Sequence, residues 1–568
     1  MKNIILIFVT LSCLAGCRCA HSSPVKGSDN SVINGSTNSD PSPTRPGHNG
    51  MYALWGDPNA DMSDAPYIVG SQIVVQWKQV EPKEGEYDFS AIDSKLKALA
   101  EKGFYTTVQI NGNEKPAWMF DKIPYIEKKL HIQVRDAKGT LMFWYPAFQK
   151  AYMNLLEAYA NYLKNTPYTN YLIGVRMNFN AVGTEQFTMN SADAPLSKWV
   201  IPKGVTDALP WKSEYNTAYK TAVVAKHVEL FADSHIRVFM RNNIDDNIRK
   251  DYIDLFKKGK LAWFHTSSEA DPRAQGTEIQ YITFMDYCRT GYTLGYAEPW
   301  ASAFGVHGGQ TDPRGCQPEQ WFYWRLLNDL NCGVSCIGLY TLDLEIATKG
   351  KIPKVGNLTT SPFIRQNFTE SILFASKYAG YHTQPDKSPG AWVAFRQWDK
   401  KIDDNSKVFQ DYVVDYSFLS IKLPDKSPSG YQETKGVINV GPKDQRYGAF
   451  AREAAVGQPI DIALHPAFIS SLLGKTATLR VIYLNTGTST WQIAWGDQIF
   501  TVQNTNSGRF ETAEFTVNPI ASKNGDIGAK AVESGTLKSR QPKGLTPDLT
   551  LKVNKGNPVT FHMVEVLR

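Results

Sequence analysis

The stretch Met51-Tyr52-Ala53-Leu54-Trp55-Gly56-Asp57-Pro58 decides the fold class that the sequence predicts. Its first part, 51–55, is an apolar run of the length of a buried strand. In an open, doubly wound α/β sheet a Gly-rich phosphate-binding loop would follow such a first strand. Here Gly56 is followed by Asp57 and Pro58, so no loop of that kind is present. The sequence therefore favours a closed barrel over an open sheet.

Seven further apolar runs follow along the chain, and helical stretches separate them. Strands that alternate with helices are typical of a parallel sheet built from βαβ units. Eight such units before about residue 386 fit the length and order of a (β/α)8 TIM barrel. The seven further runs are 72–80, 104–110, 172–179, 236–240, 261–265, 292–297 and 334–340.

The segment 90–103 illustrates how the intervening helices are predicted. Ile92, Leu96 and Leu99 recur at the spacing of one helix face. Ser90 is a favourable N-cap residue, and Gly103 suits the left-handed conformation that often ends a helix. Two more helices are predicted over 147–164 and 321–330.

Beyond about residue 386 the pattern changes to short β-rich runs with Gly, Asn and Pro between them. Several short strands with turn signals are typical of an antiparallel sandwich. We therefore predict an α/β chain in which a TIM barrel over 50–385 precedes a jelly-roll-like β-sandwich over 386–568. The sandwich either binds carbohydrate or braces the barrel, and the sequence leaves both interpretations open. The runs are 476–484, 490–495, 510–517, 549–553 and 559–566.

The first 16 residues, with Lys2 before an apolar run, are typical of a signal peptide. That run is too short for a permanent bilayer-spanning helix. It ends in Leu14-Ala15-Gly16-Cys17, which resembles a bacterial lipobox and implies acylation of Cys17. Residues 17–49 are rich in Ser, Asn, Gly, Asp and Pro, which predicts a flexible tether. We expect an exported, membrane-anchored lipoprotein of the outer membrane, cell surface or periplasm, with plain secretion as the alternative.

Composition and charge exclude several classes of partner. The net charge of +6 is spread along 568 residues without a dense Lys/Arg block, so nucleic acid is not expected. The mildly basic balance permits an anionic glycan. No C-x-x-C pair or cluster of metal-ligand spacing occurs, so we expect no metal and no cofactor. The cysteines outside the N-terminal segment either pair or remain free buried thiols: Cys288, Cys316, Cys332 and Cys336.

Candidate site residues gather directly after the predicted strands. The active site of a TIM barrel lies at the carboxyl ends of its strands. Two carboxyl groups that flank a glycosidic bond can hydrolyse it, while Trp rings stack on sugars and Asn or Arg side chains bind hydroxyls. We therefore predict a polysaccharide or oligosaccharide substrate. The candidates are Trp55, Trp77, Asn111, Trp118, Asn178, Asn180, Glu185, Arg241, His265, Glu269, Glu298, Trp300 and His307.

One stretch carries a family resemblance that covers about residues 50–385. It reads Trp77-Lys78-Gln79-Val80-Glu81-Pro82, then Gly85, Tyr87-Asp88-Phe89 and Ile92-Asp93. It resembles the segment after strand two of the clan A glycoside hydrolases. The resemblance implies a retaining TIM-barrel enzyme with Glu185, after strand four, as acid/base and Glu298, after strand seven, as nucleophile. The chain departs from the clan at Thr184, where an Asn usually precedes the acid/base.

Two further stretches suggest the substrate. Residues 301–309, with Gln320-Trp321, resemble enzymes of bacterial polysaccharide-utilisation systems that act on galactans. The stretch His562-Met563-Val564-Glu565-Val566 resembles the jelly-roll domains appended to them. This resemblance implies a β-galactosidase or an agarase- or porphyranase-like activity on an agar-, porphyran- or carrageenan-like galactan.

Other roles for the same carboxylates remain open. Glu185 and Glu298 could be rim carboxylates that pair with Arg176, Arg241 or Arg314, as is common on surfaces. Glu269 is the main rival for a catalytic role. We expect Glu81 to buttress a loop instead of reacting, and His265 and His307 either to contact substrate or to be structural.

Two other functional classes are alternatives to the hydrolase. Thr184 and the appended sandwich motivate the first, a non-catalytic glycan-binding surface lipoprotein with an inactive barrel. The second, a polysaccharide lyase, would need a Tyr/His/Arg/Lys constellation that usually occurs on another fold. The sequence favours the hydrolase.

Overall fold

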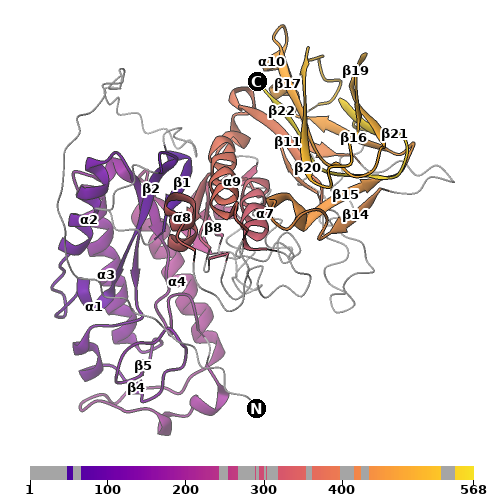
Figure 1. Ribbon diagram of the computed structural model, residues 1–568. Coiled ribbons are helices and arrows are strands. Elements are labelled where there is room, and N and C mark those ends of the chain that lie inside the picture. The colour runs from indigo at the N-terminus through magenta and orange to yellow at the C-terminus, as the bar shows by residue number, and fades with distance from the viewer. Residues whose placement is uncertain are drawn as a thin grey trace, which may run out of the picture. The chain divides into compact units, whose positions relative to one another are not determined.

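Eight parallel strands close into a barrel in the order β1-β10-β9-β8-β7-β6-β3-β2 (Figure 1). This confirms the predicted TIM barrel. The computed structural model describes residues 48–54, 65–187, 189–241, 254–256, 258–265, 288–289, 293–299, 302–303, 317–352, 361–396, 415–423, 434–525 and 544–568. The barrel strands are β1 (Gly50–Ala53), β2 (Ile68–Gln76), β3 (Tyr105–Asn111), β6 (Leu172–Arg176), β7 (Arg237–Arg241), β8 (Ala262–His265), β9 (Gly295–Ala297) and β10 (Cys336–Leu339).

The second strand ends earlier than the apolar run predicts. The strand stops at Gln76, and Trp77–Val80 form the short helix α1. The main-chain amide of Gln76 donates to the Gln79 side chain at 2.8 Å, which caps this turn. The prediction of a strand through Val80 was therefore wrong, because a local capping interaction ends the extended conformation.

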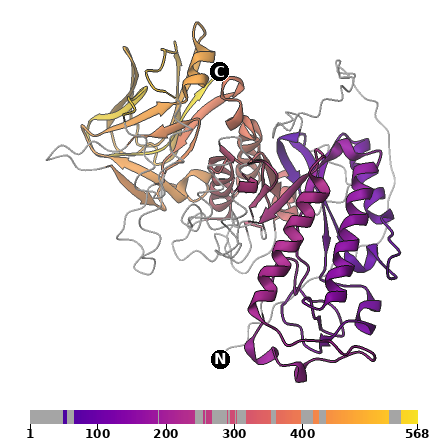
Figure 2. The same cartoon turned by 180° about the vertical axis from the view of Figure 1, so that it is seen from behind.

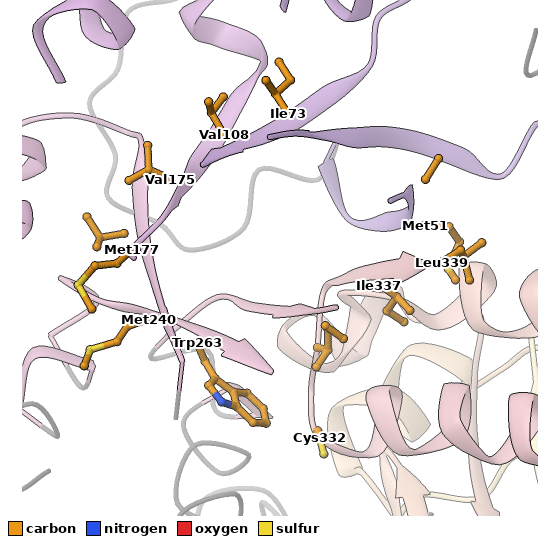
Figure 3. Packing of buried hydrophobic residues seen from close by; sticks show 14 of the residues in the cluster. Met51, Ile73, Val108, Val175, Met177, Met240, Trp263, Cys332, Ile337 and Leu339 are labelled. Atoms are coloured by element: carbon orange, nitrogen blue, oxygen red, sulfur yellow. The ribbon is translucent and has the colours of Figure 1, made fainter. Parts of the chain in front are cut away.

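Side chains of the barrel strands alternate between two apolar layers. The interior holds an aromatic group that includes Tyr52, Phe239 and Phe264. Residues on the outward faces pack towards the surrounding helices, and Figure 3 shows several of them, among them Ile73 and Trp263. Trp263 and Phe264 are sequence neighbours on opposite faces of β8, so the barrel has a packed core and not an open pore.

The helices of the first half of the barrel are α2 (Ser90–Glu101), α3 (Pro146–Asn165) and α4 (Ser213–Phe231), and α3 and α4 lie side by side (Figures 1 and 2). Ile92, Leu96 and Leu99 form the buried face of α2, as predicted. Ser90 is the first residue of α2 and not its N-cap, a position that Phe89 takes. Gly103 has a φ of 73°, the left-handed conformation expected after this helix.

The second half of the barrel contributes α7 (Pro318–Asn331), α8 (Thr341–Lys349) and α9 (Ile364–Tyr378). The predicted helices over 147–164 and 321–330 thus lie within α3 and α7. Every residue of α7 is buried. Among the residues that the structure describes, no helix is both long and apolar enough to span a membrane.

The C-terminal region forms two antiparallel sheets, which confirms the predicted sandwich. Buried residues such as Trp491, Leu551 and Phe561 form its core. The first sheet contains β11 (Gly390–Ala394), β12 (Tyr416–Phe418), β14 (Lys435–Ile438), β15 (Phe450–Ala454), β17 (Ala477–Leu484), β20 (Phe510–Val517) and β22 (Val559–Leu567). The second contains β13 (Ser420–Lys422), β16 (Pro459–Leu464), β18 (Thr490–Trp495), β19 (Gln498–Gln503) and β21 (Leu549–Lys555).

The three cysteines in the described part of the chain, Cys288, Cys332 and Cys336, are buried and lie outside any disulfide. Burial raises the pKa of the Cys336 thiol to about 12, so it stays protonated near neutral pH. Of the two interpretations left open by the sequence, buried thiols outside a disulfide hold for these three residues. Cys316 lies outside the described residues.

Candidate active site

Two glutamates lie at the carboxyl ends of barrel strands. Glu298 directly follows β9, and Glu185 lies on the segment that follows β6. Each side chain is only 7% exposed. Because the strands are parallel, their carboxyl ends meet at one rim of the barrel. The two residues singled out by the sequence therefore share that rim.

The guanidinium of Arg176 contacts both carboxylates. Its Nη2 donates to Glu185 Oε1 at 2.8 Å, and its Nη1 donates to the two oxygens of Glu298 at 3.0 and 3.1 Å. Arg176 ends β6, and its guanidinium carbon lies 4.2 Å from the ring centroid of Phe264 on β8. This cation–π contact supports the guanidinium from the barrel interior. Both carboxylates thus lie within hydrogen-bonding distance of one planar group.

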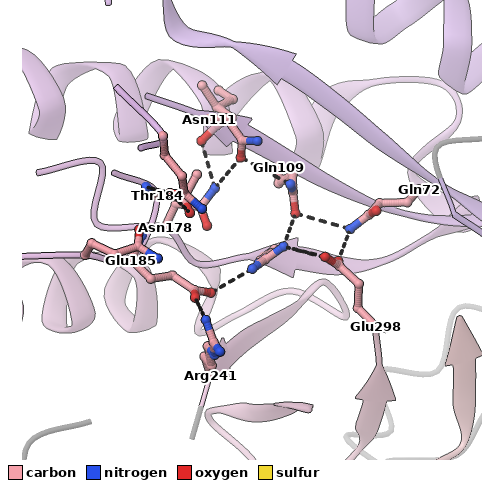
Figure 4. Close-up of polar contacts among 12 residues, drawn as sticks. Gln72, Gln109, Asn111, Asn178, Thr184, Glu185, Arg241 and Glu298 are labelled. Carbon is pink, nitrogen blue, oxygen red and sulfur yellow. Dashed lines mark hydrogen bonds and ion pairs between the residues drawn. The ribbon is translucent and has the colours of Figure 1, made fainter. Parts of the chain in front are cut away.

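A second arginine contacts Glu185 from the neighbouring strand. Arg241, the last residue of β7, donates through Nη1 to Glu185 Oε2 at 2.6 Å (Figure 4). Burial by itself raises the pKa of Glu185, but the charges of Arg176 and Arg241 outweigh burial and hold that pKa below its usual value. Burial by itself lowers the pKa of Arg176, but the charges of Glu298 and Glu185 outweigh burial and hold that pKa above its usual value. These four side chains therefore form a charge-balanced buried cluster.

A row of side-chain amides leads away from Glu298, from the middle of β2 to the carboxyl end of β3 (Figure 4). Gln72 Nε2 donates to Glu298 Oε2 at 2.7 Å and to Gln109 Oε1 at 3.2 Å. Gln109 Nε2 donates to Asn111 Oδ1 at 3.1 Å, and Asn178 Nδ2 donates to the same oxygen at 2.8 Å. Two buried acceptors of this row, Gln72 Oε1 and Asn178 Oδ1, have no partner among the described residues. Unpartnered buried acceptors of this kind are uncommon in folded proteins.

Asn180 has a structural position, which corrects its prediction as a substrate contact. It is fully buried, its Nδ2 donates to the carbonyl of Ile110 at 3.0 Å, and its Oδ1 accepts from the amide of Gly112 at 2.7 Å. A Cβ on Gly112 would lie 2.7 Å from the Cβ of Asn180. Asn180 therefore clamps the segment after β6 onto the segment after β3.

Trp77 is a core residue and not a sugar platform, which corrects a second prediction. It is 0% exposed and packs against Phe148 and Tyr152. Its indole Nε1 donates to Glu81 Oε2 at 2.7 Å, while Glu81 Oε1 accepts from the amide of Gly85 at 3.0 Å. Burial raises the pKa of Glu81, and these two hydrogen bonds oppose the rise. The expected loop-buttressing role of Glu81 is confirmed by these contacts.

The remaining predicted residues differ in how much of each the structure describes. Trp118 is half-buried on the segment after β3, and its indole Nε1 has no partner among the described residues. The side chain of His265 is not described, although its backbone ends β8. The others lie outside the described residues, so their roles stay predictions: Trp55, Glu269, Trp300 and His307.

Three residues of the cluster were given no role in the sequence prediction of the site. Gln72 and Gln109 were not singled out, and Arg176 entered only as a pairing partner. The sequence signal that could have identified them is a polar residue inside an apolar strand run. Burying an unpaired polar side chain costs free energy, so such a residue indicates a buried hydrogen-bond partner. The sequence offered pairing of these glutamates with arginines on the surface as the alternative to a catalytic role, and in the structure both glutamates do pair with arginines, but with side chains that are only 7% exposed.

The cluster contains the groups that acid/base and nucleophilic chemistry require. Two carboxylates share one rim, and donors hold each of them in place. In the described part of the chain, no group of three or more His, Cys, Asp or Glu residues is arranged to hold a metal ion.

Part of the chain matches a known family. Residues 55–258 match the β-galactosidase family model of glycoside hydrolase family 42, which is less than half of the chain. The matched region includes Arg176, Glu185 and Arg241 and ends before Glu298. The match confirms the resemblance of the barrel to the clan A glycoside hydrolases and supports a glycosidase.

Solved structures similar to the chain include enzymes that act on glycosides. A β-galactosidase from Rahnella sp. R3 is 12% identical, with a TM-score of 0.37, and the match covers 59% of this chain and 57% of that one. The family 42 β-galactosidase Gan42B from G. stearothermophilus is 12% identical, with a TM-score of 0.35, covering 60% and 59%. The catalytic domain of a β-amylase from Paenibacillus polymyxa is 11% identical, with a TM-score of 0.35, covering 58% and 99%. The chain spans less than two thirds of the length of these two β-galactosidases.

Proposed function

We propose that this chain is a retaining glycoside hydrolase that cleaves β-glycosidic bonds in a galactan. The observation that carries the proposal is the pair of buried carboxylates, Glu185 after β6 and Glu298 after β9, which contact the same guanidinium. The family match over residues 55–258 supports the β-galactosidase-like class. The galactan, with an agar-, porphyran- or carrageenan-like polymer as the specific case, rests on the sequence resemblance alone.

The proposed reaction has two steps. In the first step Glu298 attacks the anomeric carbon, the bond to the leaving oxygen breaks, and Glu185 donates a proton to that oxygen. The product is a glycosyl ester on Glu298. In the second step Glu185 takes a proton from water, the hydroxide adds to the anomeric carbon, and Glu298 leaves as a carboxylate. Two inversions give overall retention of configuration.

Gln72 and Arg176 orient the nucleophile in this proposal. Together they donate to both oxygens of Glu298. These donors restrict rotation of the carboxylate, and positioning of this kind lowers the activation free energy. Asn111, Asn178 and Trp118 would contact sugar hydroxyls or ring faces at the same rim, together with the predicted residues Trp55, His265, Trp300 and His307.

The acid role of Glu185 sets a condition on the reaction. A general acid must be protonated, yet two arginines hold the pKa of Glu185 below its usual value. Substrate must therefore weaken one of these ion pairs, or the enzyme must work at acidic pH. The same ion pairs favour the second candidate function, a barrel that binds glycan without cleaving it.

Product release from a panel of neutral and sulfated galactans tests the proposal. We expect wild-type protein to release sugars, and we expect Glu298→Gln and Glu185→Gln to lose activity while still binding glycan. The matched control is Glu114→Gln, because Glu114 follows another barrel strand, β3, at this rim but pairs with Lys78 at 2.6 Å on the surface. The anomeric form of the first product, followed by proton NMR, reports the stereochemistry. Binding of a galactan without release by the wild type would favour the binding protein.

We also propose that the protein is exported and anchored to a membrane through lipid on Cys17, as its lipobox-like sequence suggests. We expect Cys17→Ala to move the protein from the membrane to the soluble fraction of the cell of origin. Cys19→Ala is the matched control, two residues away. Membrane retention of Cys17→Ala would exclude this anchor.

A further inference from the structure

Arg241 forms the open edge of the buried cluster. Its side chain is 29% exposed, compared with 10% for Arg176 and 7% for Glu185. Arg176 uses both terminal nitrogens on the two carboxylates. Arg241 uses one nitrogen, Nη1, and Glu185 is the acceptor recorded for it in the described part of the chain. A guanidinium carries five N–H donors in a planar fork, so Arg241 retains donors besides this bond, and its buried Nε has no partner among the described residues.

The proposed reaction creates a charge imbalance at this position. With both glutamates ionised, the charges of Arg176, Arg241, Glu185 and Glu298 sum to zero. When Glu185 carries the proton that it must donate, one positive charge remains uncompensated beside it. A neutral sugar offers no charge that could take its place, so Arg241 would hold Glu185 in the form that cannot act as an acid.

An anionic group on the substrate would balance the uncompensated positive charge and would release Glu185 from its ion pair with Arg241. Arginine binds sulfate and carboxylate groups through two parallel hydrogen bonds, and such charge-assisted bonds are stronger than neutral ones. A sugar anion that engages Arg241 would replace Glu185 as its counter-ion. Glu185 would then be free to take up a proton at the moment when substrate is bound.

We propose that Arg241 is the centre of a subsite for an anionic substituent, a sulfate ester or a carboxylate, on the sugar bound next to the scissile bond. This inference rests on the proposed glycosidase function and names its substrate class. It assigns Arg241 two tasks. Arg241 selects charged galactans, and it allows Glu185 to become protonated only when the anionic group of a bound substrate replaces Glu185 as its counter-ion.

Three matched substrates test the subsite: a neutral β-linked galacto-oligosaccharide, the same compound carrying a 6-sulfate, and the same compound oxidised at C6 to a carboxylate. The measurement is kcat/KM for wild type, Arg241→Gln and Arg237→Gln at fixed ionic strength. Arg237 lies at the opposite end of the same strand, where it donates to the carbonyl of Gly259. It therefore controls for loss of an arginine charge.

We expect the wild type to prefer at least one anionic substrate by roughly 10-fold or more, the effect of one charge-assisted contact. Arg241→Gln should abolish this preference and Arg237→Gln should retain it. The sulfate and carboxylate arms identify which anion the subsite accepts. Equal or better turnover of the neutral substrate by the wild type would overturn the inference, and so would a preference that survives Arg241→Gln.

A binding measurement separates failure of this inference from failure of the proposed function. Calorimetric titration of the three oligosaccharides into Glu298→Gln and into Glu298→Gln/Arg241→Gln requires no turnover. If the wild type cleaves none of them, Arg241-dependent binding of an anionic compound still supports the subsite. Equal binding of all three compounds, or no binding of the anionic ones, overturns it.

Discussion

Gln72 Nε2 lies 2.7 Å from Glu298 Oε2, and this hydrogen bond links the second barrel strand, β2, to the residue that follows the seventh, β9. Glu298 lies one residue beyond its strand, so its own main chain gives it little support there. A side chain from β2 therefore helps to hold the proposed nucleophile in place. The donor is itself fixed, because Gln72 also donates to Gln109 at 3.2 Å.

We expect Gln72→Ala to lower kcat/KM by roughly 10- to 100-fold, the effect of losing a hydrogen bond to a charged group. The measurement is steady-state hydrolysis of the best galactan substrate, with thermal unfolding as a check on the fold. Gln492→Ala, which loses a contact with Asn554 on the sandwich, is the control. Full activity of Gln72→Ala would show that Arg176 alone positions Glu298.

We expect Arg241→Gln to shift the pH dependence of the reaction. Arg241 is one of the two charges that lower the pKa of Glu185, so its removal raises that pKa. The acid must be protonated, and activity is lost as the pH rises through its pKa. The basic limb of kcat/KM on a neutral substrate should therefore move to higher pH in Arg241→Gln and stay in place in Arg237→Gln. An unshifted limb would assign the acid to another residue.

Asp343, near the start of α8, should make stability depend on pH. Burial raises the pKa of Asp343 from 3.8 to about 7, although the amide of Ala303, 3.0 Å away, and Arg325 oppose the rise. The folded protein thus binds more protons than the unfolded chain between about pH 4 and 7. This contribution is fully present below about pH 4 and is lost as the pH rises through about 7.

We expect Asp343→Asn to reduce the fall in stability across this window, by up to about 1.4 kcal/mol per pH unit. The variant keeps the Oδ1 acceptor for Ala303 but does not titrate. Thermal unfolding at several pH values between 4.5 and 8 measures the difference from the wild type. Asp233→Asn is the control, since Asp233 is 82% exposed. Parallel curves for Asp343→Asn and wild type would contradict the prediction.

We expect Trp77→Leu to destabilise the barrel by about 3–5 kcal/mol without a specific effect on KM. The substitution removes a fully buried ring and leaves Glu81 without the indole donor. Trp118→Leu is the matched comparison, because Trp118 is half-buried at the rim and should affect KM more than stability. Denaturant unfolding and substrate titration distinguish the two effects. A raised KM in folded Trp77→Leu would restore Trp77 as a substrate contact.

The order of elements was predictable because each barrel strand appears in the sequence as an apolar run with helical spacing between runs. Glu298 was predictable for the same reason, as the first carboxylate after the seventh run. The residue at which β2 ends was not predictable, because it depends on the capping contact of Gln76 with Gln79. Trp77, predicted as a rim residue, instead begins the short helix α1 and packs into the core against Phe148 and Tyr152.

The environment of the candidate site was less predictable than its two glutamates. Asn180 looked like a ligand contact because it follows a strand, but the close approach of Gly112 makes it a clamp between segments almost 70 residues apart in sequence (separation 68). Gln72 and Gln109 appear in the sequence as interruptions of apolar runs. Only the closure of the barrel brings them to Glu298 and Arg176.

The charge balance around Arg176 also limits how this barrel can diverge. Loss of any one of its four charges leaves a buried charge without its partner, a change that usually costs several kcal/mol, whereas joint replacement of an acid and a base by apolar residues is often tolerated. Substitutions here should therefore be strongly non-additive. Descendants that abandon catalysis should therefore lose an arginine and a glutamate together more readily than either residue alone.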